Sequence, residues 1–314
     1  MSRDKYSSGD GYMYVYLLSI VACVVVALVV ALMVFGSGLF KKSETSAPAD
    51  NDTSKEVSDV SSDDNSDIYG TESEPSRFTQ GSVDNVEVNN GLLILVNAEN
   101  KYVSTEESDR LNMYTVLKGS NVAQRNTKIY MNSTAAKAVR TMCEAFYAKS
   151  GLGSGLLVSD GYLALEEAAI PGTSDYHTGN TVKLMAWPST AGKMGEGQFE
   201  WFLDNCYSYG FILRYPEGKD AATGMKGDSG VYRYVGVCHA YYMYKNNLSL
   251  EEYLELVKEY TPEEPLIIDV QNKSYEVYYQ PMEDGLTTSI KVPIDSAYLI
   301  SGNNSDGFVI TVTG

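Results

Sequence analysis

The stretch NCYSYGFILRYPEGKDAATG, residues 205–224, places a helix end, a tight turn and a strand next to one another. The helical pattern over residues 199–209 stops at Gly210, and glycine often ends helices because it adopts the left-handed conformation without steric cost. Residues 211–215 then predict a strand, which Pro216 ends because proline cannot donate a sheet hydrogen bond. The stretch therefore predicts a helix that passes directly into a strand.

The segments around this junction mix helices and strands. Short apolar runs over residues 91–97 and 156–159 predict buried strands. Helices are predicted over residues 135–149, 236–245 and, behind a capping box that begins at Ser249, 253–260. No regular βαβ repeat connects these elements, so we assign the chain to the α+β class.

The chain changes character after Pro262. Short alternating stretches replace the helical patterns, and turn signals rich in Asp, Asn and Gly separate them. Strands are predicted over residues 275–279, 288–292, 298–301 and 307–312. We therefore expect a β-rich C-terminal module, residues 263–314, docked on a main domain, residues 86–262.

Charge and histidine content exclude two kinds of function. The 24 Lys and Arg residues oppose 41 Asp and Glu residues, which gives a net charge of −17. No nucleic-acid partner is expected, because phosphate binding needs a basic surface. His177 and His239 are the only histidines in the sequence, so a three-histidine metal site is excluded.

The N-terminal region predicts a membrane anchor followed by a tether. Residues 13–40 are uncharged as far as Phe40 and mostly apolar, and they are long enough to span a bilayer as an uncleaved anchor. A cleaved secretory signal is the alternative, although its apolar core is normally shorter. The flanking basic residues balance, so they do not orient the anchor. Residues 41–85 are strongly acidic and predict a disordered tether, with an acidic docking tail as the alternative.

Three stretches together carry a resemblance to a known family. They are GLLILVNAENKYV from Gly91, the stretch from Asn205 quoted above, and YRYVG from Tyr232 followed by LSLEEYL from Leu248. They resemble the VanY-type D-alanyl-D-alanine carboxypeptidases, zinc enzymes of the hedgehog/DD-peptidase fold that trim the stem peptide of the bacterial cell wall. The family works outside the cytoplasmic membrane, which implies that residues 1–12 are cytoplasmic and that the protein is a single-pass membrane protein with its main domain outside.

The resemblance also identifies positions where this sequence departs from the family. The three positions that hold zinc ligands in the family carry Tyr176, Lys183 and Val231, and the general-base position carries Asp228. A phenol is a poor zinc ligand at neutral pH, valine has no donor atom, and an ammonium repels the ion. We therefore expect no zinc and no other cofactor.

A rebuilt metal site is the alternative. It would use Asp175, His177 and Asp228, although His177 stands one residue late and Lys183 would still oppose the ion.

Substrate recognition is altered as well. Leu163 stands where the family has the arginine that receives the terminal carboxylate. A polar ligand-binding cleft is nevertheless predicted from Tyr162, Ser174, Tyr176, His177, Lys183 and Tyr232. In this hypothesis the ammonium of Lys183 replaces the metal as the positive charge that faces a ligand carboxylate. A solvent-facing or salt-bridged lysine is the alternative interpretation.

The remaining reactive side chains are expected to have structural roles. His239 is expected to be a structural histidine, because it lies beyond the ligand positions. Cys143, Cys206 and Cys238 are expected to be buried free thiols, and a disulfide between two of them stays open because spacing does not decide it.

These observations favour a membrane-anchored, extracytoplasmic relative of the carboxypeptidases that is zinc-free and catalytically inactive. Its partner would be a peptidoglycan stem peptide or a wall-processing protein. One alternative is an active zinc D-alanyl-D-alanine carboxypeptidase. Another is an interaction-only scaffold that uses the β-rich module of residues 263–314.

Overall fold

The computed structural model describes residues 76–103 and 109–314, and these residues belong to one compact unit. Within these ranges no helix has the length and apolar character needed to cross a membrane. The expected anchor, residues 13–40, lies outside the described residues, as does most of the expected tether. Both therefore stay predictions.

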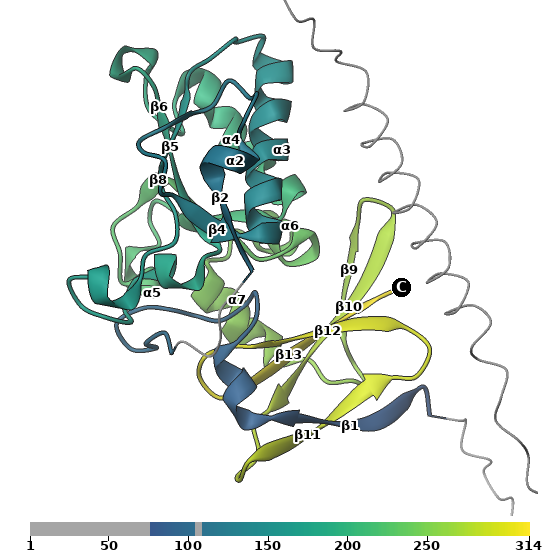
Figure 1. Ribbon diagram of the computed structural model, residues 1–314. Helices are drawn as coiled ribbons and strands as arrows, with labels where there is room; N and C mark the ends of the chain where they lie inside the picture. Colours follow the sequence, from purple (N-terminus) through teal and green to yellow (C-terminus); the bar gives the residue numbers. More distant parts are fainter. Residues whose placement is uncertain (1–75, 104–108) are drawn as a thin grey trace, which may run out of the picture. The chain divides into compact units, whose positions relative to one another are not determined.

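A five-stranded sheet forms the centre of the main domain (Figure 1). Its strands, in spatial order, are β3 (Ala123–Gln124), β5 (Leu156–Asp160), β6 (Thr181–Ala186), β8 (Asp228–Tyr234) and β7 (Phe211–Tyr215). All neighbouring pairs are antiparallel except β3 and β5, which are parallel. The strand predictions over residues 156–159 and 211–215 are confirmed. β6 and β8 were not predicted: Lys183 interrupts the apolar residues of β6, and polar residues make up much of β8.

The longest helix, α3 (Ser133–Ser150), covers one face of this sheet and confirms the helix predicted over residues 135–149 (Figure 1). Side chains alternate between the two faces of a strand, so Val182 and Leu184 of β6 enter the core beside Phe146 of α3. Lys183, between them, points to the opposite face. That opposite face carries the site described below.

The helix predicted over residues 199–209 is instead three short pieces. These are η5 (Gly197–Glu200), α4 (Trp201–Asn205) and η6 (Cys206–Tyr209). The 3₁₀ turns tighten the chain ahead of Gly210, which has a φ of 83°. A side chain at Gly210 would meet the ring of Tyr234 at 2.7 Å, so the turn needs glycine for space as well as for conformation.

Two helices follow the central sheet. α6 (Val237–Lys245) follows its N-cap Gly236 and confirms the helix predicted over residues 236–245. α7 (Leu250–Val257) begins at the predicted capping box, where Ser249 Oγ accepts from the Glu252 backbone N–H and a Glu252 carboxylate oxygen accepts from the Ser249 backbone N–H. The helix ends at Val257 rather than at residue 260.

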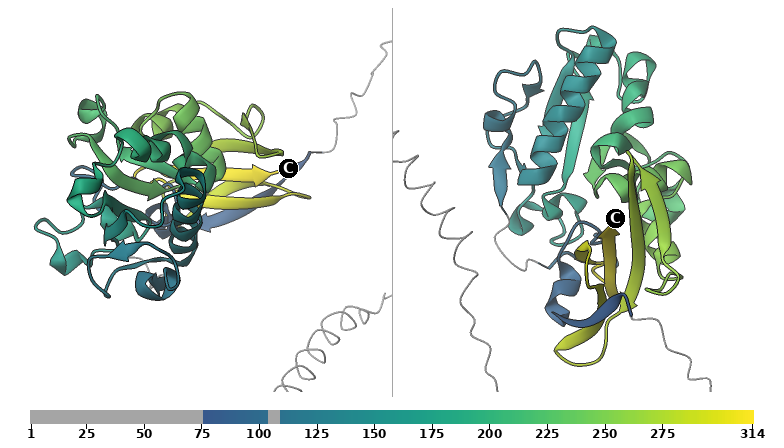
Figure 2. Two further views of the ribbon diagram at one scale, coloured as in Figure 1. Left: turned by 90° about the horizontal axis from the view of Figure 1, so that it is seen from above. Right: turned by 90° about the vertical axis from the view of Figure 1, so that its right-hand side faces the viewer.

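The C-terminal module is built on a four-stranded antiparallel sheet at one end of the molecule (Figure 2). In spatial order its strands are β12 (Ala297–Gly302), β13 (Gly307–Thr313), β10 (Lys273–Pro281) and β9 (Leu266–Val270). The strands predicted over residues 275–279, 298–301 and 307–312 are confirmed, and β9 is an additional strand. One face of this sheet packs against α6 and α7 through Ile268 and Val277, which gives the two regions a shared core.

The boundary predicted between tether and domain is wrong. Residues 78–84 form β1 (Phe78–Asp84), which pairs along its whole length with β11 (Thr287–Pro293). Phe78 and Val83 also pack against the apolar cluster around Tyr278. Few apolar residues lie in this segment, but a strand partner satisfies its backbone, and a charge count cannot reveal that pairing. The folded region therefore begins before residue 86, and part of the β-rich module comes from the N-terminal side.

The strand predicted over residues 91–97 is also wrong, because this buried segment has no strand partner. Side chains bind much of its backbone instead. Arg233 donates to the carbonyl oxygens of Leu92 and Ile94, and the Leu93 N–H donates to Ser301 Oγ at 2.9 Å. The remaining short elements are η1 (Asn85–Asn89), β2 (Arg110–Asn112), α2 (Met113–Val116), β4 (Tyr130–Asn132), η2 (Leu165–Glu167), η3 (Asp175–Thr178), η4 (Ser189–Ala191) and α5 (Asp220–Thr223).

Candidate functional site

A cavity of about 890 Å³ opens on the face of the central sheet opposite α3. It is bordered by the ends of β5 and β8, by η3, by the α5 region and by the buried segment that follows Gly91. Seven residues singled out from the sequence line it: Tyr162, Leu163, Ser174, Tyr176, Lys183, Asp228 and Val231. The structure therefore brings together the three zinc-ligand positions of the resemblance and its general-base position.

Strand pairing explains this convergence. Lys183 of β6 lies directly opposite Val231 of β8 in the antiparallel ladder. On the other side of β6, an irregularity in β5 between Val158 and Asp160 shifts the register, so that Asp160 is the partner of Lys183. The cavity floor is thus a row of three neighbouring strands with Lys183 in the middle.

The ammonium of Lys183 is already paired. Lys183 Nζ donates to Asp228 Oδ2 at 2.5 Å, and the two side chains are 31% and 37% exposed. The alternative interpretation from the sequence, a salt-bridged lysine, is the one that the structure shows. The residue at the family's general-base position therefore neutralises the residue at a metal-ligand position.

Tyr176 contributes a neutral hydroxyl to the cavity. Burial raises the pKa of Tyr176, and the carboxylates of Asp160 and Asp228 raise it further because they repel a phenolate. The phenol keeps its proton at neutral pH and is a hydrogen-bond donor rather than an anionic ligand.

Two residues predicted for the cleft do not line the cavity. Tyr232 alternates with Val231 along β8, so it points into the core under α3, where its hydroxyl donates to the Ser229 carbonyl at 2.8 Å. His177 is fully buried. Its Nε2 accepts from the Gly172 N–H at 3.2 Å, and its Nδ1 lies 2.7 Å from the Leu163 carbonyl oxygen, which fixes a neutral tautomer with the proton on Nδ1.

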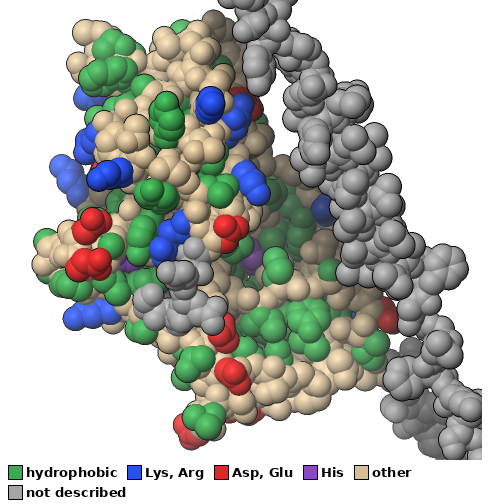
Figure 3. Space-filling view, viewed as in Figure 1, with side chains coloured by type: hydrophobic (Ala, Val, Ile, Leu, Met, Phe, Trp, Pro, Cys, Tyr) green, Lys and Arg blue, Asp and Glu red, His purple; other side chains and the backbone are tan. Residues whose placement is uncertain are grey.

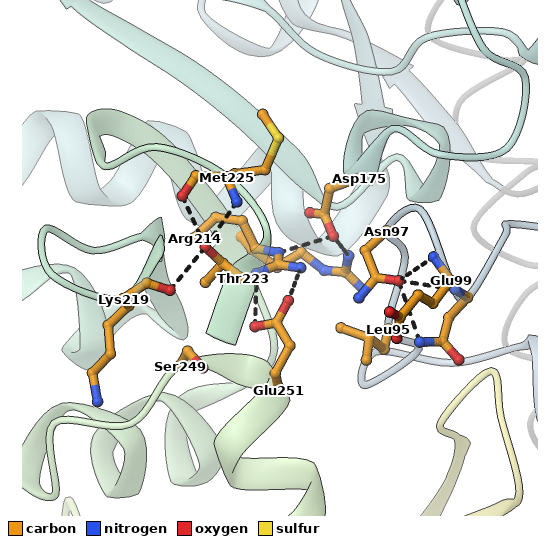
Figure 4. A network of polar contacts seen from close by, with 12 residues as sticks. Leu95, Asn97, Glu99, Asp175, Arg214, Lys219, Thr223, Met225, Ser249 and Glu251 are labelled. Carbon is orange, nitrogen blue, oxygen red and sulfur yellow. Dashed lines mark hydrogen bonds and ion pairs between the residues drawn. The ribbon is translucent and has the colours of Figure 1, made fainter. Parts of the chain in front are cut away.

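The sequence did not reveal a buried ionic network next to the cavity (Figure 4). Asp175 Oδ1 accepts from Arg214 Nε at 3.1 Å and from an Arg233 guanidinium N–H at 2.9 Å, with no exposure of any of these side chains. Arg214 also forms a two-point pair with Glu251 of α7, at 2.8 and 3.1 Å. The sequence feature that could have indicated this network is Arg214 within the apolar pattern of a strand, because a charge at such a position needs a buried partner.

This network governs the ionisation of Asp175. Burial opposes the charged form, but Arg233 and Arg214 outweigh that cost and hold the pKa of the Asp175 carboxyl below its ordinary value. The hydroxyl of Thr181 also donates to this carboxylate. The segment that carries Tyr176 is therefore anchored from beneath by a fixed negative charge between two arginines.

The residues at the three family positions do not fit a zinc ion. Tyr176 is protonated, Val231 has no donor atom, and Lys183 presents a positive charge. Throughout residues 76–103 and 109–314, no group of three or more His, Cys, Asp or Glu side chains is arranged to hold a metal ion.

The rebuilt set considered as an alternative does not assemble either. Asp175 is committed to two arginines, both ring nitrogens of His177 face backbone groups, and Asp228 is paired with Lys183.

The other reactive side chains have structural surroundings. His239 Nδ1 lies 2.7 Å from the Tyr253 hydroxyl, and its Nε2 lies 3.1 Å from Thr311 Oγ1. Burial lowers the pKa of His239 to about 4. The three cysteines of the described residues are buried and free, and burial raises the pKa of each thiol to about 12: Cys143, Cys206 and Cys238.

Comparison with known proteins assigns the class to which this fold and cleft belong. The sequence model of the family described as VanY, D-alanyl-D-alanine carboxypeptidase, matches residues 159–237, which contain the cavity floor. A solved structure of the vancomycin-resistance D,D-dipeptidase VanXYg, in complex with a D-Ala-D-Ala phosphinate analogue, is similar with a TM-score of 0.65 and 25% identity. That likeness covers 76% of this chain and 99% of the other, and it gives the α+β fold of the hedgehog/DD-peptidase type.

Two curated relatives carry the assignment further. A D-alanyl-D-alanine carboxypeptidase of Enterococcus faecium is 30% identical over 242 residues, which cover 72% of this chain and 76% of the relative. One from Enterococcus faecalis strain V583 is 39% identical over 90 residues, or 29% of this chain and 33% of that protein. The chain therefore belongs to the VanY D-alanyl-D-alanine carboxypeptidase family.

Proposed function

We propose that this protein is a zinc-free, catalytically inactive member of the family that uses the retained cavity to bind a peptidoglycan stem peptide or to engage a wall-processing protein. The ion pair between Lys183 and Asp228 is the observation that carries the proposal. It fills the place where the family's zinc chemistry would occur with two charges that neutralise each other.

Loss of catalysis follows from what peptide hydrolysis by a zinc enzyme requires. A bound metal lowers the pKa of a water molecule and polarises the scissile carbonyl, and a nearby carboxylate takes the proton. Here the three ligand positions lack a competent set, and the Asp228 carboxylate accepts from the Lys183 ammonium. Several independent parts of the reaction would have to be rebuilt together for turnover to return.

Retention of a binding role rests on the cavity itself. Its volume of about 890 Å³ lies within the range of ordinary ligand pockets. Tyr162 and Ser174, which match the family pattern, still line it. Since the similar solved structure holds a D-Ala-D-Ala analogue, we take a wall peptide as the ligand.

We further propose that the protein is held at the cell membrane by residues 13–40, with residues 1–12 in the cytoplasm and the folded region outside. The uncharged length of this segment supports the anchor. The location of the family outside the cytoplasmic membrane supports the orientation. Protease treatment of intact cells tests this directly. Degradation of an epitope at residue 314, with an epitope at residue 1 protected, is expected, whereas the reverse pattern contradicts the proposed orientation.

An assay of the full-length chain in detergent tests binding and inactivity together. A pentapeptide that ends in D-Ala-D-Ala is titrated by calorimetry, and D-alanine release is followed with and without added zinc. We expect saturable binding and no release above that of a zinc-free blank. Zinc-dependent release that a chelator abolishes would establish the active-enzyme alternative.

A second candidate function uses the C-terminal module alone. β12 is an edge strand of its sheet and exposes Tyr298 and Leu299, at 40% and 66%. Figure 3 shows hydrophobic side chains gathered over the region of the C-terminal strands. If exchange of both residues for lysine abolishes association with a wall-processing partner while peptide titration has no effect, this interaction-only role replaces the cavity-based one.

A further inference from the structure

One wall of the cavity is a loop without regular secondary structure. Residues 96–99 line the cavity and belong to no helix or strand. The side-chain oxygen of Asn97 accepts from the backbone N–H groups of Glu99 and Asn100, at 3.0 and 2.8 Å (Figure 4). These bonds shape the turn within the loop, but they do not tie it to a neighbouring element. The place of this wall therefore depends on how the two ends of the loop are held.

A side chain of the C-terminal module joins the two ends. Asn304, in the turn between β12 and β13, donates from Nδ2 to the Leu95 carbonyl oxygen at 2.8 Å and to the Lys101 carbonyl oxygen at 3.2 Å. Leu95 and Lys101 stand directly before and after residues 96–100. The Leu95 N–H also donates to the Asn303 carbonyl oxygen at 3.1 Å. The amide of Asn304 thus closes the base of the loop that forms the cavity wall.

The conformation of Asn304 is costly unless this contact compensates for it. Its φ is 62°, in the left-handed region that asparagine tolerates better than most residues. The residue is 7% exposed, and its Oδ1 is buried without a hydrogen-bond partner among the residues that the structure describes. A buried unpaired acceptor is destabilising. What the side chain gains in return is the pair of hydrogen bonds to the loop.

Further bonds fix the segment that leads into the loop. Ser301 Oγ accepts from the Leu93 N–H at 2.9 Å, and the Gly302 N–H donates to the Asn90 carbonyl oxygen at 2.8 Å. This segment therefore lies against the same turn between β12 and β13. It gives the Asn304 amide a fixed base from which to hold the loop.

We infer that Asn304 is a positioning residue for the ligand cavity, and that the C-terminal module completes the binding site by holding residues 96–100 in place. This inference rests on the proposed function, in which the cavity binds a wall peptide. Without the amide the loop occupies more positions. The apparent affinity then falls with the fraction of molecules whose loop stands in the binding position.

The variant Asn304→Gly tests this inference. Glycine adopts the left-handed backbone without strain, so the exchange removes the amide and keeps the turn. In the full-length chain in detergent, hydrogen exchange of residues 92–102 is followed by mass spectrometry, and a pentapeptide ending in D-Ala-D-Ala is titrated by calorimetry. We expect exchange at least about threefold faster and binding about three- to tenfold weaker, as for one lost hydrogen bond. The melting temperature should stay within about 3 °C, because the unpaired oxygen leaves with the amide.

Asn272 provides the matched control. It is exposed, lies in the turn between β9 and β10 of the same module and has a φ of 60°. Asn272→Gly is therefore the same chemical change on the same kind of backbone, and we expect exchange over residues 92–102 and peptide affinity to stay within about twofold of the wild type. Equal losses in both variants would indicate a general loosening of the module and overturn the inference.

A second variant keeps the side-chain volume. Asn304→Asp replaces the donor with an anionic acceptor that faces two carbonyl oxygens, so we expect binding at least about tenfold weaker than in the wild type. Faster exchange with unchanged affinity would make Asn304 merely structural and overturn the inference. So would unchanged exchange and affinity in Asn304→Gly, and in both cases the proposed function stands. A wild type that does not bind the peptide overturns the proposed function and this inference together.

Discussion

Two clusters of charged side chains lie on the same face of the central sheet, one at the cavity floor and one beneath it. The pair formed by Lys183 and Asp228 is about one-third exposed, whereas the cluster around Asp175 and its two arginines has no exposure. Both bring a carboxylate against a cation at hydrogen-bond distance. Burial makes the removal of one partner from the cluster around Asp175 costly, because it leaves an unpaired buried charge, whereas water can solvate either partner of the pair at the floor.

The largest expected effect comes from rebuilding the metal site at the cavity floor. The triple variant Tyr176→His, Lys183→Asp and Val231→His should bind one zinc ion with a Kd of about 1 μM or lower, since three competent ligands are restored. Calorimetry with zinc measures this. The double variant Tyr176→His and Val231→His keeps the ammonium and should bind at least about a hundredfold more weakly. Failure of a folded triple variant to bind zinc would show that the three positions do not form a metal site.

The next effect concerns the buried cluster. Asp175→Asn should lower the free energy of unfolding by about 3–5 kcal/mol, because Arg214 and Arg233 lose their shared counter-charge without any change in side-chain volume. Urea unfolding followed by tryptophan fluorescence measures the loss. A loss below about 1 kcal/mol would remove the distinction between the two clusters.

Stability should also depend on pH through the buried histidine. Burial lowers the pKa of His239 from 6.5 to about 4, so between these values the unfolded chain binds a proton that the folded chain excludes. Stability is therefore fully present above pH 6.5 and falls toward pH 4, by about 3 kcal/mol at 1.4 kcal/mol for each pH unit of difference. Melting temperatures of the wild type and of His239→Gln, measured across this pH range, show how much of the pH dependence of stability is due to His239. If the two curves are parallel, His239 does not carry it.

Below this range the cluster around Asp175 adds to the loss. The pKa of Asp175 is lower in the folded protein than in the unfolded chain, so its contribution is present above the unfolded value of about 3.8 and disappears as the pH falls through the folded value. The variant Asp175→Asn should therefore show a weaker acid transition than the wild type.

The smallest effect is expected at the cavity floor. Lys183→Met should change the free energy of unfolding by less than about 1 kcal/mol, because both members of the pair keep contact with water. The same urea titration as for Asp175→Asn gives a direct comparison. A loss of several kcal/mol would mean that this pair is structural, as the buried cluster is.

The sequence predicted elements that have strong local signals and missed those defined by distant partners. α3 and β7 were recognised because helical spacing and a glycine-to-proline strand segment are local patterns. The sequence placed β1 in the tether because its partner strand, β11, lies some two hundred residues away. It predicted a strand over residues 91–97 because it does not show that the side chains of Ser301 and Arg233 form hydrogen bonds with this backbone. Apolar content indicates burial, but it does not say which groups satisfy the backbone.

In the candidate site, too, the sequence predicted some features correctly and missed those that depend on strand alternation or side-chain partners. The family resemblance predicted that Tyr176, Lys183 and Val231 share one site, and all three line the cavity, where the ladder between β6 and β8 pairs Lys183 with Val231. It misassigned Tyr232, which strand alternation turns into the core, and His177, whose ring is bound by backbone groups. The pairing of Lys183 with Asp228 depends on side-chain geometry, so the sequence left it as one of two alternatives.

Zinc-edge anomalous diffraction from crystals grown with excess zinc tests the central claim most directly. We predict no anomalous peak within coordination distance of Tyr176, Lys183 or Asp228, and density that keeps the Lys183 ammonium on the Asp228 carboxylate. A peak at the cavity floor, with Lys183 displaced and Asp228 turned toward the ion, would contradict the account.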